Sequence, residues 1–151
     1  MVRIVQHKLN FNYDKLIERK LSKIYLIILH HTASPSATVE GIHSDHLKRG
    51  WAGIGYHFLI QPDGTIDKGR GIEYVGSHCA GNNTSSIGIA LVGDFRRTQP
   101  TEKQLESLSE LIQFMKKHVP SIKRVLNHND LYKTLCPVVD LKSLVKDKVN
   151  E

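Results

Sequence analysis

The pattern of apolar and polar positions along the chain predicts several buried strands. Residues 24–30 form a continuous apolar run rich in β-branched side chains, which is typical of a strand buried on both faces. Residues 86–92 have the same pattern, and residues 123–127 predict a shorter strand that leads into His128. Residues 53–61 are also strand-like, and the Pro-Asp-Gly-Thr sequence that follows them predicts the turn of a β-hairpin.

The chain also carries three segments with helical spacing. Residues 38–49 predict a helix that Gly50 ends. Thr101, with Gln104 three residues later, predicts a capping box at the start of a long helix whose apolar residues recur at spacings of three and four. Asp140 is expected to cap a final amphipathic helix.

Strands and helices therefore alternate, which predicts an α/β fold with a central mixed β-sheet flanked by helices on both faces. A chain of 151 residues fits one domain and is long enough to bury a core without depending on disulfides or a metal alone. Residues 1–22 are polar and basic around a few apolar side chains. They are expected to pack on the body as a short helix or an extended arm, leaving residues 23–151 as the main domain.

Charge and hydropathy narrow the class of partner. The chain has 21 Lys and Arg against 15 Asp and Glu, a formal net charge of +6, which favours an anionic partner such as nucleic acid, a membrane surface or an acidic cell-wall polymer. The sequence carries neither a helix-turn-helix pattern nor an aromatic-plus-basic repeat, so no nucleic-acid partner is expected. Its apolar runs are shorter than the roughly 18 residues of a membrane span, and we expect no membrane insertion.

Three residues far apart in the chain suggest a metal site. His30 and His128 each follow a predicted strand, and Cys136 lies on a segment that fits neither one helix face nor one strand. Zn²⁺ accepts imidazole nitrogen and thiolate sulfur, and a catalytic site uses three protein ligands so that water takes the fourth position. Alternatives remain at this point: His30 as a strand-end histidine bonded to backbone, Cys136 as a small buried thiol, and the adjacent His31 as the ligand in place of His30.

Seven ordered blocks of sequence carry a family resemblance that covers residues from about 24 to 142. The chain resembles the zinc N-acetylmuramoyl-L-alanine amidases of the amidase type 2 and peptidoglycan recognition protein superfamily, and the T7 phage lysozyme type in particular. The blocks are His-His-Thr-Ala-Ser (30–34), Gly-Trp (50–51) with Gly-Tyr-His-Phe-Leu-Ile (55–60), Asp-Gly-Thr-Ile (63–66), Gly-Arg (69–70), Val-Gly-Ser-His (75–78), Asn83 with Ser-Ile-Gly-Ile (86–89), and His128 through Cys136 and Pro137.

The resemblance implies roles for particular residues. His30, His128 and Cys136 match the ligands of one Zn²⁺ ion. Tyr56 matches a tyrosine whose hydroxyl lies beside the metal-bound water and the scissile carbonyl. Thr134 matches a second catalytic position, where the phage enzymes have a lysine and many recognition proteins have a threonine.

Two departures from the family pattern leave the proton acceptor open. Lys133 is displaced by one position from the place of the phage lysine, so that role does not transfer to it. Ala90 stands where some relatives carry a glutamate that serves as base, although phage-like members work without that glutamate.

Substrate contacts are also expected from the matched blocks. His46 and Trp51 are expected at the edge of a glycan–peptide groove, and His78 is expected to line it. The structural alternatives are a loop histidine for His78 and a packed core aromatic for Tyr56. His43 and His46 have a spacing that could mimic a metal pair, but a solvated helix turn is expected there. The predicted substrate-binding residues are His31, His46, Trp51, His78 and Asn83.

The resemblance implies an enzyme that hydrolyses the amide between N-acetylmuramic acid and L-alanine in bacterial peptidoglycan. The N-terminus does not read as a secretory signal, so we expect a monomeric phage or prophage endolysin, made in the cytoplasm of the infected host and acting on the wall after release. Two alternatives are a peptidoglycan-binding module without catalysis and an amidase that also regulates a phage RNA polymerase.

Overall fold

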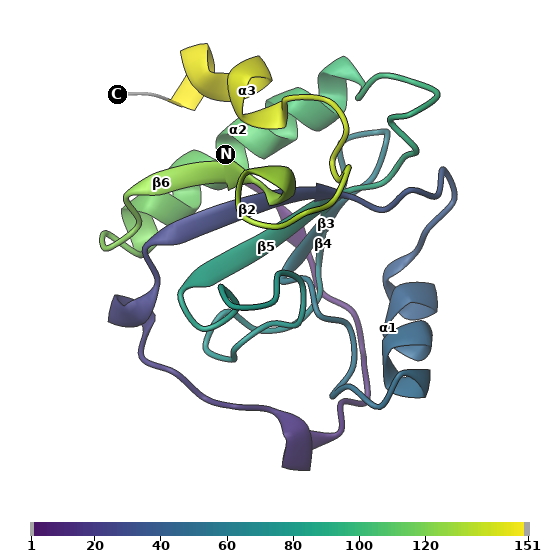
Figure 1. Cartoon of the computed structure of the whole chain (residues 1–151), viewed down its shortest axis with the longest axis vertical. Coiled ribbons are helices and arrows are strands. Elements are labelled where there is room, and N and C mark those ends of the chain that lie inside the picture. Colours follow the sequence, from purple (N-terminus) through teal and green to yellow (C-terminus); the bar gives the residue numbers. More distant parts are fainter. Residues whose placement is uncertain (1, 150–151) are drawn as a thin grey trace.

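The computed structural model describes residues 2–149. Residue 1 of the predicted N-terminal segment 1–22, and residues 150 and 151 of the predicted main domain 23–151, lie outside the described residues. One mixed sheet forms the centre, with strand order β1-β4-β3-β5-β2-β6 (Figure 1). The strands are β1 (Ile4–Val5), β2 (Leu26–His31), β3 (Phe58–Ile60), β4 (Ile66–Lys68), β5 (Ser86–Leu91) and β6 (Arg124–Asn127). The helices are α1 (Val39–Lys48), α2 (Glu102–His118) and α3 (Leu141–Val149), and the short 3-10 turns are η1 (Tyr13–Lys15), η2 (Leu21–Lys23) and η3 (His128–Asp130).

The pairing of β2 decides which chain segments meet at one edge of the sheet. β2 lies between β5 and β6 and is parallel to both, whereas β3 pairs antiparallel with β4. Leu29 is in register with Asn127, and His30 with Ala90. Because parallel strands end at the same edge, the residues that follow β2 and β6 emerge side by side.

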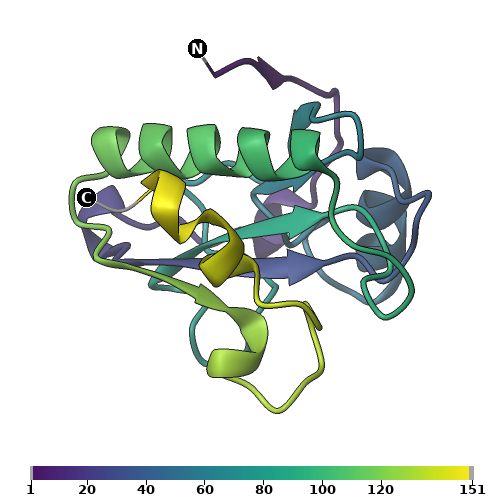
Figure 2. The same ribbon diagram turned by 90° about the horizontal axis from the view of Figure 1, so that it is seen from above.

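The alternation of side chains along β2 divides the core between the two faces. Ile27 and Leu29 are fully buried against α2 and α3, which lie together on one face of the sheet (Figure 2). Leu26 and Ile28 point to the opposite face, where they pack around Cys79. Each such fully buried aliphatic side chain contributes about 1.5–3 kcal/mol of transfer free energy, so the register of β2 is strongly fixed.

Helix α1 covers part of that second face, so the prediction of helices on both faces is confirmed. Val39 of α1 packs with Ile54 and Leu59 there, in a cluster that also includes Ala90 and Val92. Figure 1 shows α1 standing apart from the layer formed by α2 and α3. No helix within residues 2–149 is long and apolar enough to cross a membrane.

The predicted capping box of the long helix is also confirmed. The Thr101 hydroxyl accepts from the Gln104 N–H at 3.0 Å, and the Gln104 side-chain oxygen accepts from the Thr101 N–H at 3.0 Å. The Gln104 amide then donates to the carbonyls of Ile60 and Val92, at 3.1 and 2.8 Å. The helix start is thereby tied to β3 and to the end of β5.

The predicted strand over residues 53–61 is wrong in length, because only Phe58–Ile60 forms a strand. Gly53 has a φ of +143°, which takes the chain out of the extended region. At the next position along the ladder, the Gly88 N–H donates to the imidazole Nδ1 of His57 at 3.0 Å. The His57 ring thus accepts the hydrogen bond from the Gly88 N–H that a backbone carbonyl would accept if β3 were longer.

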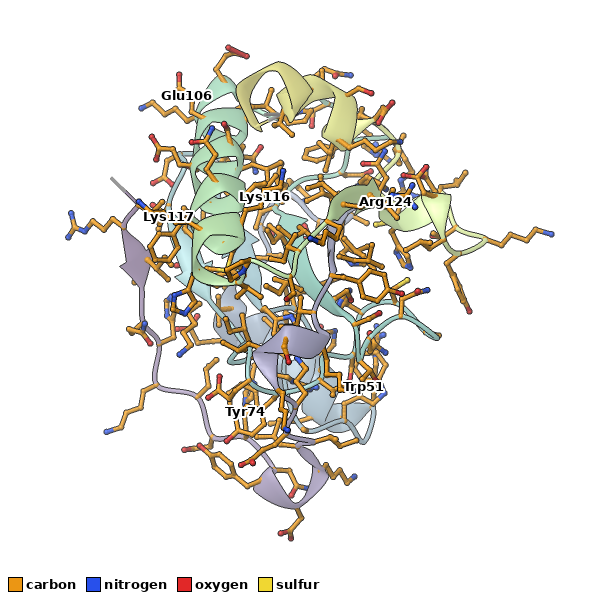
Figure 3. All side chains as sticks on the ribbon, turned by 90° about the vertical axis from the view of Figure 1, so that its left-hand side faces the viewer. Trp51, Tyr74, Glu106, Lys116, Lys117 and Arg124 are labelled. Atoms are coloured by element: carbon orange, nitrogen blue, oxygen red, sulfur yellow. The ribbon has the colours of Figure 1, made fainter. Side chains whose placement is uncertain are left out.

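Residues 2–22 form an extended arm interrupted by the short turns η1 and η2, which decides between the two predicted conformations. Ile4 pairs with Ile66 at the edge of the sheet, and Glu18 forms an isolated bridge with Tyr74. Figure 3 shows the Tyr74 side chain near the turns of this arm. The boundary at residue 22 stays a prediction.

Candidate metal centre

His30, His128 and Cys136 come together at one edge of the sheet. His30 is the penultimate residue of β2, His128 begins η3 directly after β6, and Cys136 lies on the following loop. One potential ligand atom from each of the three lies within 4.8 Å of the others. The Cys136 Sγ is 3.8 Å from the His30 Nδ1, and the two imidazole rings have centroids 4.5 Å apart.

One atom of this cluster lacks a partner. Among the side chains that the structure describes, which end at residue 145, the His128 Nδ1 is the buried nitrogen that has no hydrogen-bond partner. A buried polar atom without a partner costs about 1–3 kcal/mol, so its presence beside a second imidazole and a thiol calls for a ligand. Two imidazole nitrogens and one sulfur are donors that suit Zn²⁺. The residues present therefore fit a metal ion.

The electrostatics of the cluster favour neutral imidazoles. Burial lowers the pKa of His30 well below its ordinary value, and the neighbouring His128 lowers it further. Burial also lowers the pKa of His128 and raises the pKa of the Cys136 thiol to about 11. The His31 backbone N–H donates to the Cys136 Sγ at 3.3 Å, which favours the thiolate that a metal requires.

Strand alternation turns the rings of His30 and His31 in different directions. His30 points into the cluster, whereas the His31 imidazole turns toward Phe95, with ring centroids 5.6 Å apart. The His31 Nδ1 accepts from the Phe95 N–H at 3.2 Å. His31 still borders the hollow above the cluster, but one of its ring nitrogens is occupied.

A polar network holds η3, which carries His128, against the start of α3. The Asn127 amide donates to the Asp140 carboxylate at 2.7 Å, and the Lys142 N–H donates to the Asn127 side-chain oxygen at 3.1 Å. The Asp130 carboxylate accepts from the Asn127 N–H at 2.8 Å and pairs with the Lys142 ammonium at 3.0 Å. These contacts fix the end of β6 and η3, and with them the backbone of His128, against the start of α3.

Tyr56 borders three hollows beside the cluster, and these three hollows together are called the groove. The tyrosine borders a hollow of about 290 Å³ at His30 and Cys136, one of about 560 Å³ toward Trp51, and one of about 330 Å³ along α1. Its ring centroid is 5.1 Å from that of His30. Burial, and secondarily the Cys136 thiolate, raise the pKa of Tyr56 well above its ordinary value, so its hydroxyl keeps its proton.

Thr134 fixes the loop that carries Cys136. The Thr134 hydroxyl oxygen accepts from the Cys136 N–H at 3.2 Å, so the hydroxyl proton remains available to an acceptor in the hollow that Thr134 borders. Lys133 is exposed and does not border that hollow, whereas Ala90 is fully buried in β5. Neither position supplies a carboxylate.

His46 of α1 and Trp51, which follows the end of that helix, border the same hollow of the groove. Figure 3 labels Trp51 beside α1. The His46 Nδ1 accepts from the Gly55 N–H at 2.9 Å, and its ring meets Trp51 edge-on with centroids 4.6 Å apart. Burial lowers the pKa of His46 to about 4. Its helix neighbour His43 is buried as well, so the expectation of a solvated turn at these two histidines is wrong: both bond the backbone of the segment that leads to Tyr56.

His78 and Asn83 lie on the loop between β4 and β5 and border the largest hollow. The His78 Nδ1 is 2.9 Å from the His30 Nε2. The Asn83 side-chain oxygen accepts from the N–H groups of His78 and Cys79, at 2.9 Å each. Part of each side chain therefore faces the protein rather than the groove.

Two arginines at the groove escaped prediction from the sequence. Arg49, at the end of α1, lies 5.3 Å from the Trp51 ring centroid and borders the two hollows on that side. Arg96 borders the metal hollow and is held by the Asp94 carboxylate through contacts of 2.8 Å. The Gly-Trp block next to Arg49 could have indicated that Arg49 lies at the groove. Arg96 lies on a loop without a periodic pattern, so the sequence contained no such indication for it.

The fold and the cluster together define an α/β protein with a groove that crosses two histidines and a cysteine placed so that they could hold a metal ion. The N-acetylmuramoyl-L-alanine amidase family matches residues 20–138 of the chain. The endolysin of Enterobacteria phage K11 is 34% identical over 119 residues, which cover 76% of this chain and 78% of that one. The chain belongs to this amidase family.

Solved structures agree with that assignment. The N-acetylmuramoyl-L-alanine amidase LysC from Clostridium intestinale URNW matches with a TM-score of 0.90 and 33% identity, covering 99% of each chain. A mutant of Drosophila PGRP-LB, solved in complex with tracheal cytotoxin, matches with a TM-score of 0.80 and 28% identity, covering 95% of this chain and 93% of that one. The predicted α/β fold with a mixed sheet is confirmed.

Proposed function

We propose that this chain is a zinc-dependent endolysin that hydrolyses the amide between N-acetylmuramic acid and L-alanine in peptidoglycan. The observation that carries the proposal is the convergence of His30, His128 and Cys136 beneath the groove, with the His128 Nδ1 buried and unpaired. These three side chains would hold one Zn²⁺ ion. Such an ion, when bound, polarises an amide carbonyl and lowers the pKa of water to about 7.

The hydroxyls of Tyr56 and Thr134 would act as hydrogen-bond donors in amide hydrolysis. The Tyr56 hydroxyl keeps its proton and lies beside the cluster, so it can donate a hydrogen bond to an oxyanion that develops on the scissile carbonyl. The Thr134 hydroxyl has a proton to donate toward the same hollow. With alanine at position 90, the chain uses no carboxylate base at that place.

The groove suits an anionic glycopeptide. Arg49 and Arg96 border its hollows on either side of Tyr56, and stem peptides carry carboxylates. His31, His46, Trp51, His78 and Asn83 are the proposed substrate contacts along its walls. A binding module would need the groove alone, whereas this groove centres on a metal-ligand set with a protonated tyrosine beside it.

We further propose that the enzyme acts as a monomer on the cell wall, without a nucleic-acid partner, after synthesis in the cytoplasm of a phage-infected host. The net charge of +6 would hold it near anionic wall polymers. This attraction should weaken with added salt.

The test of the function combines metal removal with product analysis. Purified peptidoglycan is digested with the metal-replete chain, with the chain stripped by a strong zinc chelator, and with the stripped chain after Zn²⁺ is restored. We expect mass spectrometry to find free stem peptides that begin with L-alanine in the first and third digests. Release of those peptides by the stripped chain would refute the zinc mechanism, and their absence from all three digests would refute the amidase.

A further inference from the structure

His78 makes the hydrogen bond that sets the orientation of His30. The His30 Nδ1 faces the Cys136 Sγ, while its other ring nitrogen, Nε2, lies 2.9 Å from the His78 Nδ1. The two rings are nearly perpendicular, with an interplanar angle of 85°. A metal would bind the Nδ1 of His30, so the proton of His30 stays on Nε2. The His78 Nδ1 must then accept the hydrogen bond from this N–H.

This donor direction continues through His78 into the protein. With its Nδ1 acting as acceptor, His78 carries its own proton on Nε2, which lies 3.2 Å from the Ser86 hydroxyl oxygen. The Ser86 hydroxyl in turn donates to the Asn82 carbonyl at 2.7 Å. Each donor finds one acceptor, so the chain of bonds fixes a single tautomer of both imidazoles.

Two glycines make the space that brings the His78 ring onto the sheet. A Cβ at Gly88, in the centre of β5, would lie 2.6–2.7 Å from three atoms of that ring. A Cβ at Gly76 would lie 2.8 Å from the Cδ2 of the same ring and equally close to His57. Side chains larger than hydrogen at these positions would push His78 away from His30.

The segment from His78 to Ser86 is anchored at both of its ends. The Asn83 side chain accepts the backbone N–H of His78, and Arg19 of the N-terminal arm donates to the carbonyls of Asn83 and Ser86 at 2.9 and 2.8 Å. Burial lowers the pKa of Arg19 to about 10. The arm therefore helps to place a loop whose histidine contacts the metal cluster.

We propose that His78 is a positioning residue that orients His30 for the metal and holds it in the tautomer with Nδ1 free. The role rests on the proposed zinc site. Second-layer partners of this kind typically change metal affinity by about 10–100-fold when they are replaced. The expected substrate contact by His78 would then be secondary to this role.

Three substitutions of His78 distinguish the effect of its hydrogen-bond acceptor from the effect of its ring volume. In His78→Asn, an amide oxygen can occupy the place of Nδ1 and still accept from His30. In His78→Gln, the amide reaches the place of Nε2 and keeps only the Ser86 contact. His78→Leu keeps volume and removes both bonds. Zinc affinity is measured by competition with a fluorescent zinc indicator, and ligand geometry by the visible absorption of the Co²⁺-substituted protein.

We expect the Asn variant to keep zinc affinity close to that of the unmodified chain, and the Gln and Leu variants to lose about 10–100-fold, with altered Co²⁺ absorption. The unfolding of each metal-free variant is followed in parallel. Equal zinc affinity in all variants, or an Asn variant as weak as the Leu variant, would overturn the role of His78. Failure of the unmodified chain to bind Zn²⁺ would instead overturn the proposed function on which it rests.

Discussion

Two buried regions of the molecule contain histidines, and they differ in what their ring nitrogens do. Beneath α1 and β5, the His43 Nδ1 accepts from the Ile54 N–H at 3.0 Å and its Nε2 bonds the Asn10 carbonyl at 3.0 Å. The His57 Nδ1 accepts from the Gly88 N–H, and its Nε2 bonds the Tyr74 carbonyl at 2.9 Å. In the metal cluster, by contrast, the His128 Nδ1 is left without a partner.

Burial and charge do not distinguish the two regions. Burial lowers the pKa of His57 to about 3, and it lowers the pKa of His30 strongly as well. His57 and His30 are therefore both neutral at neutral pH. The difference lies in hydrogen bonding: backbone groups satisfy one set of histidines, and the other set keeps a nitrogen for a ligand. An unpaired ring nitrogen is thus a better sign of function than a shifted pKa.

The largest expected effect comes from removing the sulfur of the cluster. Cys136→Ser replaces a thiolate by a poor zinc ligand, so we expect zinc affinity to fall by more than the roughly 100-fold typical of second-layer changes, and wall hydrolysis to be lost. Zinc content after dialysis and the release of stem peptides measure the two effects. The free cysteine Cys79, changed to Ser, is the matched control. Full zinc occupancy in the Cys136 variant would place the third ligand elsewhere.

Tyr56→Phe tests a group that touches the reaction without holding the metal. Its ring packing against His30 is retained, so zinc binding should stay unchanged. Loss of one hydrogen-bond donor to a developing oxyanion typically lowers kcat by about 10²-fold. Turnover of a defined muropeptide, with zinc content as the control, measures this loss. An unchanged kcat would remove the tyrosine from the mechanism.

His43→Ala should give the opposite outcome to the two preceding changes. It leaves the buried Ile54 N–H without its acceptor and releases the Asn10 carbonyl, so we expect the free energy of unfolding to fall by about 1–3 kcal/mol. Zinc affinity should remain unchanged. Denaturant unfolding of the metal-free protein measures the loss, and His43→Asn, which can restore an acceptor at Nδ1, should recover part of it. A loss of zinc binding would contradict the division into two regions.

The smallest expected effect concerns His7, an arm histidine that is paired with carboxylates. Its hydrogen bond to Asp67, and secondarily the charges of Asp67 and Glu40, raise the pKa of His7 above 6.5. A raised pKa in the folded state means that protonated His7 stabilises the fold below pH 6.5, and that this contribution is lost as pH rises through the folded-state pKa.

His7→Gln provides the measurement of that contribution. The difference in unfolding free energy between the unmodified chain and this variant should be larger at about pH 5.5 than at about pH 8.5. A difference that does not change with pH would contradict the assignment. Because Glu40 is exposed, the part of the difference that comes from the His7–Glu40 pair should also shrink with added salt.

Local sequence was sufficient for much of the fold. The capping box of Thr101 and Gln104 uses contacts three residues apart. The apolar run at residues 24–30 predicts a buried strand from its composition alone. Both were predicted correctly because the deciding interactions lie within the element or in its apolar content. The strand at residues 53–61 was overestimated because the His57 ring bonds Gly88, a partner 31 residues away.

The sequence by itself named the chemistry: two imidazoles and a thiol after predicted strands, and a tyrosine in a matched block. It left open whether His30 or His31 faces the site, and it did not predict the contact between His78 and His30. The direction of His30 depends on the register of β2 against β5, and the contact with His78 depends on the space left by Gly88. Ligand types are a property of residues, whereas the direction of a ring nitrogen depends on the neighbours that packing supplies, so only the tertiary structure decided it.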